Sequence, residues 1–134
     1  MTRRKYKKIS KKKGKFRSGF EADFAEELDK LNLKWEYETK KFDYTTSHVY
    51  TSDFYIGTIH FELKGRLTSS DRSKMLAVKK EHPSADIRIV LMQDNYLYKG
   101  SKTRYSDWCK KNGFKYHVAR NGYKFPREWL KDVK

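Results

Sequence analysis

Cysteine is almost absent from these 134 residues, because Cys109 is the only one. A single cysteine excludes an intrachain disulfide and a thiolate zinc cluster, and it predicts a small buried side chain. Long apolar runs are also absent. None approaches the roughly 20 residues of a membrane-spanning helix, and none follows the N-terminal charges as in a secretory signal. We therefore expect neither a signal peptide nor a transmembrane segment, and a protein of a reducing compartment.

Acidic residues are missing from residues 1–17, where basic residues are concentrated instead. Ten of the 32 basic residues lie there and account for two thirds of the formal charge of +15. They are Arg3, Arg4, Lys5, Lys7, Lys8, Lys11, Lys12, Lys13, Lys15 and Arg17. Such a segment buries too little apolar surface to offset its ordering entropy, so we expect residues 1–15 to form a disordered arm. Nucleic acid is the favoured partner because neutralised phosphates release counterions, and a solubilising tail or a localisation signal is the alternative.

Residues 16–134 are long enough for one domain with one hydrophobic core. Their periodicity predicts helices over residues 18–30, 68–81 and 104–111 and a last helical turn from Pro126. The first helix begins with Ser18 and Glu21 spaced as in a capping box. Strand patterns occupy residues 33–37, 42–44, 49–56, 59–65, 87–92 and 114–118. This order predicts an α/β fold in which a mixed β-sheet is flanked by helices.

Two strand-like runs, 49–56 and 59–65, flank Gly57-Thr58, which is typical of a two-residue type II′ hairpin turn. In that register the opposed pairs include Asp53 with Glu62 and Thr51 with Lys64. Because side chains alternate between faces, the three charged residues share one face. The other face is apolar and consists of Phe54, Ile56, Ile59, Phe61 and Leu63.

Asp53 and Glu62 would place two carboxylates side by side, which destabilises a hairpin unless something neutralises them. A divalent cation does so, and Mg²⁺ is commonly held by one or two carboxylates together with water. Lys64 could reach over the same spot toward a phosphate oxygen or an attacking water. The alternative is a solvent-facing polar strand on which Lys64 screens the two acids.

Asp53 followed by Glu62-Leu63-Lys64 matches the Asp…(Asp/Glu)-x-Lys core of the restriction-endonuclease-like nuclease superfamily. A longer series of segments, in the same order, resembles the phage endonuclease I family of Holliday-junction-resolving enzymes over roughly residues 14–131. The segments are Phe16-Arg17-Ser18-Gly19-Phe20-Glu21, Thr51-Ser52-Asp53-Phe54, Glu62-Leu63-Lys64-Gly65, His82-Pro83, Asp86-Ile87-Arg88-Ile89-Val90, Leu97-Tyr98-Lys99-Gly100-Ser101 and Glu128-Trp129. One departure is Ser52, since the residue before the motif aspartate is usually proline in this group.

The resemblance implies a catalytic set of Glu21, Asp53, Glu62 and Lys64. Asp53 and Glu62 would bind Mg²⁺ or Mn²⁺, two ions per active site, with Glu21 at the edge and Lys64 helping to place the nucleophilic water. It also implies a restriction-endonuclease-like fold and a domain-swapped homodimer whose chains cross near residues 45–49. Glu21 would then come from one chain and the other three residues from its partner. Taken alone, the position of Glu21 indicates only a helix cap.

The resemblance further implies a structure-selective endodeoxyribonuclease that resolves four-way and other branched DNA junctions and leaves 5′-phosphate ends. The basic arm would contact the junction, and the protein would act in the cytoplasm of a phage-infected or prophage-carrying bacterium. Two alternatives stay open. One is a basic nucleic-acid-binding protein without catalysis, and the other is a nuclease of the same superfamily that acts on linear or mismatched duplex.

The four histidines, His48, His60, His82 and His117, lack zinc spacing, so no structural zinc site is expected. For His60, which faces the same side as Glu62, a surface position is favoured over a catalytic one.

An aromatic stretch could stack on bases, although its spacing favours core packing: Tyr96, Tyr98, Tyr105 and Trp108. A last group of basic residues either extends the DNA path or is simply solvated: Lys79, Lys80, Lys99, Lys102, Arg104, Lys110, Lys111 and Lys115.

Overall fold

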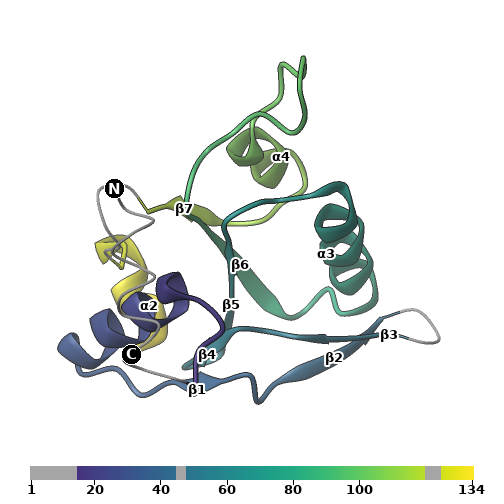
Figure 1. Cartoon of the computed structure of the whole chain (residues 1–134). Coiled ribbons are helices and arrows are strands. Elements are labelled where there is room, and N and C mark those ends of the chain that lie inside the picture. The colour runs from purple at the N-terminus through teal and green to yellow at the C-terminus, as the bar shows by residue number, and fades with distance from the viewer. Residues whose placement is uncertain (1–14, 45–47, 120–124) are drawn as a thin grey trace.

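A five-stranded mixed sheet lies at the centre of the computed structural model, which describes residues 15–44, 48–119 and 125–134 (Figure 1). Its strands, in spatial order, are β1 Glu36–Tyr37, β4 Phe54–Ile56, β5 Ile59–Lys64, β6 Asp86–Leu91 and β7 Tyr116–Val118. β1, β4 and β5 are antiparallel neighbours, whereas β5, β6 and β7 run parallel. The mixed sheet expected from the sequence is confirmed.

A separate hairpin, β2 Lys41–Tyr44 with β3 His48–Thr51, extends from the edge of the main sheet (Figure 1). The continuous strand expected over residues 49–56 is therefore wrong. It is broken at Ser52 and Asp53 into β3, which pairs with β2, and β4, which pairs with β5. Thr51 accordingly lies opposite Lys41 and not opposite Lys64. Of the segment near residues 45–49, where the resemblance implies that two chains cross, residues 45–47 lie outside the described residues.

Helices cover both faces of the sheet: α2 Gly19–Lys30, α3 Ser69–Glu81, α4 Tyr105–Lys111, the 3-10 turn η1 Arg127–Trp129 and α5 Leu130–Val133. The predicted starts are confirmed, since the Ser18 and Thr68 hydroxyls both cap their helices. α4 ends before Gly113, whose φ of 77° only glycine adopts readily. Within the described part of the chain, no helix is both long and apolar enough to cross a membrane.

The core has two parts, one on each face of the sheet. α2 and α5 close the first, where the Phe24 and Phe54 rings lie 4.8 Å apart. α3 and α4 close the second, which contains the fully buried Cys109 as predicted. β6 contributes to both, with Val90 in the first part and Ile89 in the second, so this strand is covered on both faces.

The β4–β5 turn follows the predicted register, with Ile56 opposite Ile59 and Phe54 opposite Phe61. Gly57 has a φ of 63°, as the first position of a type II′ turn requires. The turn fixes which residues of β5 face α2 and which face the β2–β3 hairpin. This placement determines which side chains of β5 can meet those of the hairpin.

Candidate active site

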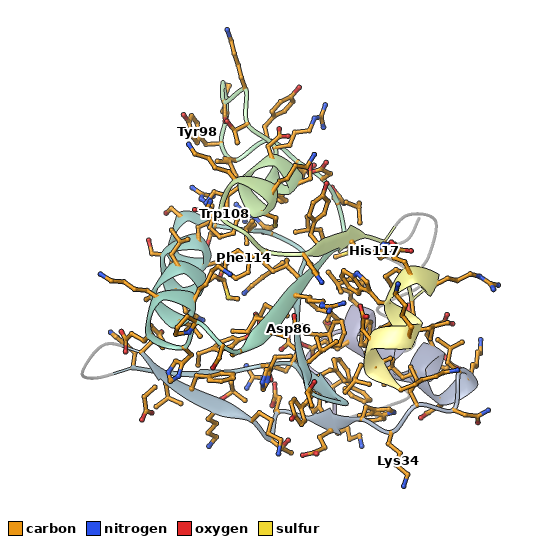
Figure 2. All side chains as sticks on the ribbon, turned by 180° about the vertical axis from the view of Figure 1, so that it is seen from behind. Lys34, Asp86, Tyr98, Trp108, Phe114 and His117 are labelled. Carbon is orange, nitrogen blue, oxygen red and sulfur yellow. The ribbon has the colours of Figure 1, made fainter. Side chains whose placement is uncertain are left out.

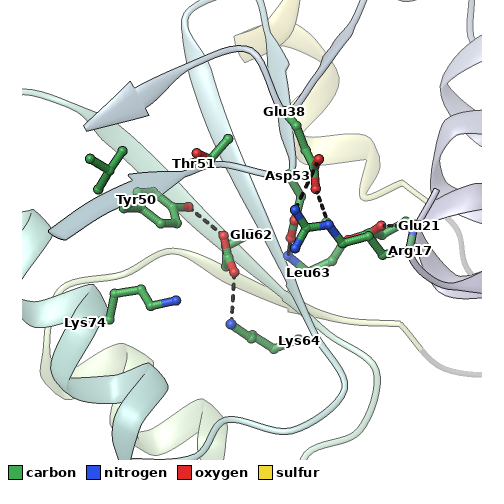
Figure 3. Close-up of a pocket in the computed structure, with 11 residues that line it drawn as sticks. Arg17, Glu21, Glu38, Tyr50, Thr51, Asp53, Glu62, Leu63, Lys64 and Lys74 are labelled. Carbon is green, nitrogen blue, oxygen red and sulfur yellow. Dashed lines mark hydrogen bonds and ion pairs between the residues drawn. The ribbon is translucent and has the colours of Figure 1, made fainter. Parts of the chain in front are cut away.

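Glu21, Asp53, Glu62 and Lys64 line one pocket of about 410 Å³ (Figure 3). Glu21 comes from the first turn of α2, Asp53 from the break before β4, and Glu62 and Lys64 from β5. The pocket wall also includes Arg17, Glu38, Val49, Tyr50, Thr51, Leu63 and Lys74. Residues separated by more than 40 positions in the sequence thus meet where α2, the β2–β3 hairpin and β5 come together.

Glu21 is 7% exposed and is held by two donors. Its Oε1 accepts from the Arg17 amide at 3.0 Å and from the Tyr37 hydroxyl at 2.6 Å. Ser18 Oγ accepts from the Glu21 amide at 3.1 Å, as a helix cap should. The reciprocal half of the expected capping box is different, since the carboxylate takes the amide of Arg17 and not that of Ser18. A side chain bonded in this way keeps a fixed direction toward the pocket.

Asp53 lies in a local irregularity of the β4–β5 ladder. Its amide donates to the carbonyl of Phe61 at 3.1 Å, although Phe61 already pairs with Phe54. Two residues therefore oppose one, as in a β-bulge, and the direct opposition of Asp53 and Glu62 expected from the sequence is wrong. Asp53 Oδ2 instead accepts from the Leu63 amide at 2.8 Å. The bulge re-aims the carboxylate into the pocket that Glu62 also reaches.

Glu62 is 6% exposed, and both of its oxygens have partners (Figure 3). The Tyr50 hydroxyl donates to Oε1 at 2.7 Å, and Lys64 Nζ lies 3.0 Å from Oε2. Burial, together with the charge of Glu62, raises the pKa of Tyr50 well above its ordinary value. Tyr50 therefore remains a neutral donor at physiological pH and fixes the orientation of the Glu62 carboxylate.

Lys64 bridges two acids, because its Nζ also lies 3.1 Å from Oδ1 of Asp71. Burial alone would lower the pKa of Lys64, but the charges of Glu62 and Asp71 outweigh burial and raise it. The ammonium is thus fully protonated at neutral pH and acts as a cation, not as a base. Asp71 also accepts from the Thr68 amide at 3.0 Å, so the start of α3 and the position of Lys64 are coupled.

The pocket carries more negative charge than Lys64 neutralises. Burial raises the pKa of Asp53 to about 9, with the charges of Glu62 and Glu21 acting in the same direction and the Leu63 amide opposing them. Like charges sharing a buried site penalise the ionised form in this way. A bound cation would remove the penalty, whereas a purely structural pocket gains nothing from the arrangement.

The donor set fits a hard divalent cation such as Mg²⁺ or Mn²⁺, since it consists of carboxylate oxygens only. Within residues 15–44, 48–119 and 125–134, no three His, Cys, Asp or Glu side chains are arranged to hold a metal ion together. The geometry therefore suits a site of one or two carboxylates completed by water and substrate oxygens, which Mg²⁺ favours. Asp53 and Glu62 are the residues whose chemistry fits, and Glu21 lies at the same pocket.

Positive side chains stand at the rim of the pocket. Arg17 pairs with Glu38 at 2.9 Å, and Lys74 extends from α3 toward the pocket (Figure 3). Of the ten basic residues among residues 1–17, Lys15 and Arg17 are described, and both are exposed. Lys15 lies 5.0 Å from the centre of the Trp35 ring. The other eight arm residues lie outside the described ranges.

His60 is not at the surface, which corrects the sequence-based expectation. It is 8% exposed, and its ring lies against Phe42 at 4.6 Å and against Tyr55 at 4.7 Å. Burial lowers the pKa of His60 to about 4, so the ring is neutral near pH 7. The β2–β3 hairpin covers this part of β5, which no strand pattern in the sequence could indicate.

Sequence reasoning missed several residues of the site, among them Tyr37, Tyr50, Asp71 and Lys74. Tyr37 and Tyr50 lie within expected strands and Asp71 within an expected helix, and periodicity does not indicate that their side chains contact Glu21, Glu62 and Lys64. Tyr37 alternates with Glu36 and Glu38, but this pattern does not indicate that its hydroxyl reaches Glu21.

Comparison with known proteins identifies one family. The family model described as phage endonuclease I matches residues 1–134. Endonuclease I of Escherichia phage T7 is 40% identical over 129 residues, which cover 92% of this chain and 84% of that protein. Endodeoxyribonuclease 1 of Enterobacteria phage T3 is 40% identical over 103 residues, covering 73% of this chain and 68% of that protein.

Proposed function

The chain belongs to the phage endonuclease I family, and from that premise we propose that it is a metal-dependent endodeoxyribonuclease that resolves four-way and other branched DNA junctions. The observation that carries the proposal is the convergence of Glu21, Asp53, Glu62 and Lys64 on one pocket that holds more acidic groups than Lys64 alone neutralises. The strongly basic composition, +15 overall, suits a polyanionic substrate. The site of action would be the cytoplasm of the phage-infected or prophage-carrying bacterium.

Asp53 and Glu62 would hold Mg²⁺ or Mn²⁺, with Glu21 beside them. Two such ions, when bound, supply an activated water and stabilise the charge of the phosphate in hydrolysis. Lys64, held protonated by Glu62 and Asp71, is placed to donate a hydrogen bond to a phosphate oxygen or to the attacking water. Cleavage of the phosphodiester would leave 5′-phosphate and 3′-hydroxyl ends, as expected for this nuclease superfamily and its restriction-endonuclease-like fold.

Selectivity for junctions would come from the shape and backbone charge of branched DNA and not from base edges. Arg17 and Lys74 at the rim are positioned for phosphates that enter the pocket. Residues 1–15 would add a DNA-contacting arm, with contacts from Arg3, Arg4, Lys5, Lys7, Lys8, Lys11, Lys12, Lys13 and Lys15.

We also propose that two chains form a domain-swapped homodimer. The supporting feature is the β2–β3 hairpin, since Glu21 precedes it in the chain and Asp53, Glu62 and Lys64 follow it. If two chains crossed near residues 45–49, residues 15–44 of one chain could make the same contacts with the second chain. Glu21 would then complete the pocket of the partner.

Mixing two inactive variants tests the swap. In a swapped dimer that combines Glu21→Gln with Asp53→Asn, one pocket contains both substitutions and the other contains neither. Activity should therefore return to roughly half of the heterodimer's pockets after joint refolding of the two chains. If each pocket belonged to a single chain, every pocket would stay defective and joint refolding would restore nothing.

The site assignment is tested with Asp53→Asn and Glu62→Gln in the full chain. Both should abolish cleavage of a four-way junction in Mg²⁺ while leaving junction binding intact. Glu36→Gln, an exposed acid on β1, is the matched control and should cleave normally. Full activity in either site variant would contradict the assignment, and binding without cleavage by the unaltered protein would favour a non-catalytic DNA-binding protein.

A further inference from the structure

The loop of residues 95–104 projects from the body of the protein between β6 and α4 (Figures 1 and 2). It is an ordered structure held by its own hydrogen bonds. The Leu97 amide donates to the Thr103 carbonyl at 2.9 Å, and the Ser101 amide donates to the Tyr98 carbonyl at 3.0 Å. At its base the Ser106 hydroxyl donates to Asp94 at 2.6 Å. A loop fixed in this way loses little conformational entropy when its side chains bind a partner.

Two tyrosines of this loop are exposed, which corrects the expectation that they pack in the core. Tyr96 is 48% exposed and Tyr98 is 65% exposed, whereas Tyr105 and Trp108 are buried as expected. The Arg104 guanidinium lies 4.4 Å from the centre of the Tyr96 ring, so one face of Tyr96 is covered. Tyr98 stands at the outer end of the molecule (Figure 2).

The charge of the loop has one sign. Residues 95–104 contain Lys99, Lys102 and Arg104 and no acid, and all three cations are exposed. Exposed aromatic rings interleaved with cations are what single-stranded nucleic acid binds, because bases stack on the rings while phosphates meet the cations. A protein partner or an apolar ligand would not explain why three exposed cations lie beside the exposed tyrosines.

The loop lies at the same end of the sheet as the catalytic lysine. β5 and β6 are parallel, with Lys64 opposite Leu91, and the Met92 amide donates to the Lys64 carbonyl at 2.9 Å. The chain leaving β6 toward Tyr98 therefore starts beside the pocket. A DNA strand bound at the pocket could continue to this loop.

We propose that the 95–104 loop contacts the substrate at the branch point, with Tyr98 stacked on a base exposed there and Lys99 and Lys102 on the neighbouring phosphates. This inference rests on the proposed function and names the part of the DNA that this surface recognises. Paired bases inside a duplex offer no free face for Tyr98, whereas bases at a branch do. The loop thus favours branched over linear DNA.

The test uses the full chain in EDTA with a four-way junction that carries 2-aminopurine at the branch point, and with the matched linear duplex. Tyr98→Ala should weaken junction binding roughly tenfold, the scale of one lost base stack, and should change the 2-aminopurine fluorescence of the complex. Duplex affinity should stay unchanged, and Tyr98→Phe should keep both properties of the native chain. Lys131→Ala, an exposed cation on α5, controls for the loss of a surface side chain.

Each outcome separates this inference from the proposed function. Unchanged junction affinity and fluorescence in Tyr98→Ala, or an equal loss on junction and duplex, would overturn branch-point stacking. If the native chain still cleaved junctions in Mg²⁺, the proposed function would stand. Conversely, a fluorescence change that depends on Tyr98, in a protein that never cleaves, would support the stacking and contradict the nuclease.

Discussion

Tyr50 and Glu62 show how one hydrogen bond between side chains can fix the direction of a buried carboxylate. Tyr50 is 3% exposed and reaches Glu62 from another strand, with 2.7 Å between its hydroxyl and Oε1. Partners of metal-binding carboxylates fix the direction of the ligand and tune its affinity. We therefore regard Tyr50 as a positioning residue of the pocket, one that need not contact DNA.

We predict that Tyr50→Phe raises the Mg²⁺ concentration for half-maximal cleavage by about 10- to 100-fold. The ring still fills its place, so the cost in stability should stay near that of one hydrogen bond, about 1 kcal/mol. Mg²⁺ titrations of junction cleavage measure the effect, with Tyr116→Phe on β7 as the control. An unchanged Mg²⁺ dependence would show that Glu62 needs no such support.

Asp53 makes the stability of the metal-free protein depend on pH. Its pKa in the folded chain, about 9, is raised above the unfolded value near 4. The folded state therefore holds the proton more tightly, and stability is lost as the pH rises from about 4 through 9.

Asp53→Asn removes this dependence because the amide does not ionise. At pH 7.5 without metal, the variant should be more stable than the native chain by about 0.5–2 kcal/mol. At pH 4 the gap should largely close, since Asp53 then begins to be protonated in the unfolded chain as well. Urea unfolding across this range measures both values, and parallel pH curves for the two proteins would contradict the account.

At the scale of elements, the sequence indicated the β4–β5 hairpin correctly, because Gly57 between two alternating runs has few other interpretations. The break at Ser52 and Asp53 was not predictable, because residues 49–56 alternate without interruption. The break follows from hydrogen bonds to other segments of the chain. The Ser52 amide donates to the Lys40 carbonyl, and the Asp53 amide donates to the Phe61 carbonyl. The sequence thus brought the acidic residues and Lys64 of the pocket together as candidates, while the bulge that aims Asp53 depended on the pairing of Phe54 with Phe61.

The β4–β5 turn also docks on the last helix. A Cβ at Gly57 would lie 3.0 Å from the carbonyl oxygen of Val133 in α5. α5 has little freedom to move away, because Asp132 pairs with the buried Arg88 at 2.8 Å. The turn therefore requires glycine for its φ and for space.

We predict that Gly57→Ala costs more stability than Gly100→Ala. Both positions have positive φ, which costs about 1–2 kcal/mol for alanine, but the Cβ at Gly100 would meet nothing within 4 Å. The backbone contact with Val133 should add at least a further 1 kcal/mol at Gly57. Urea denaturation of both variants decides this, and equal losses would mean that α5 yields to the turn.

At the scale of the whole molecule, basic residues are distributed unevenly along the chain. Residues 1–17 hold ten of the 32 basic residues, while the remaining chain has 22 basic against 17 acidic side chains. Because positive and negative side chains nearly balance outside residues 1–17, most of the long-range attraction to DNA is expected to come from residues 1–17. The sequence alone was enough to predict the uneven distribution of charge, which follows from composition. It was also enough to predict the mixed sheet, which follows from periodicity. Composition and periodicity do not predict that α2 and the β2–β3 hairpin line the same pocket.

Deleting residues 1–13 should weaken junction binding most strongly at low salt. The slope of log affinity against log salt concentration should fall by about 0.9 for each phosphate contact that is lost. Cleavage at saturating protein should be retained, because Glu21, Asp53, Glu62 and Lys64 remain. Equal slopes for the truncated and the full chain would show that residues 1–13 do not contribute to DNA binding.

Cleavage of a labelled four-way junction, compared with its matched linear duplex, tests the central claim most directly. Each DNA is incubated with the full chain in Mg²⁺ and, separately, in EDTA. The account predicts paired nicks near the crossover in Mg²⁺, none in EDTA, and a largely intact linear duplex. Tight junction binding without nicks in Mg²⁺ or Mn²⁺, or equal cleavage of both DNAs, would contradict it.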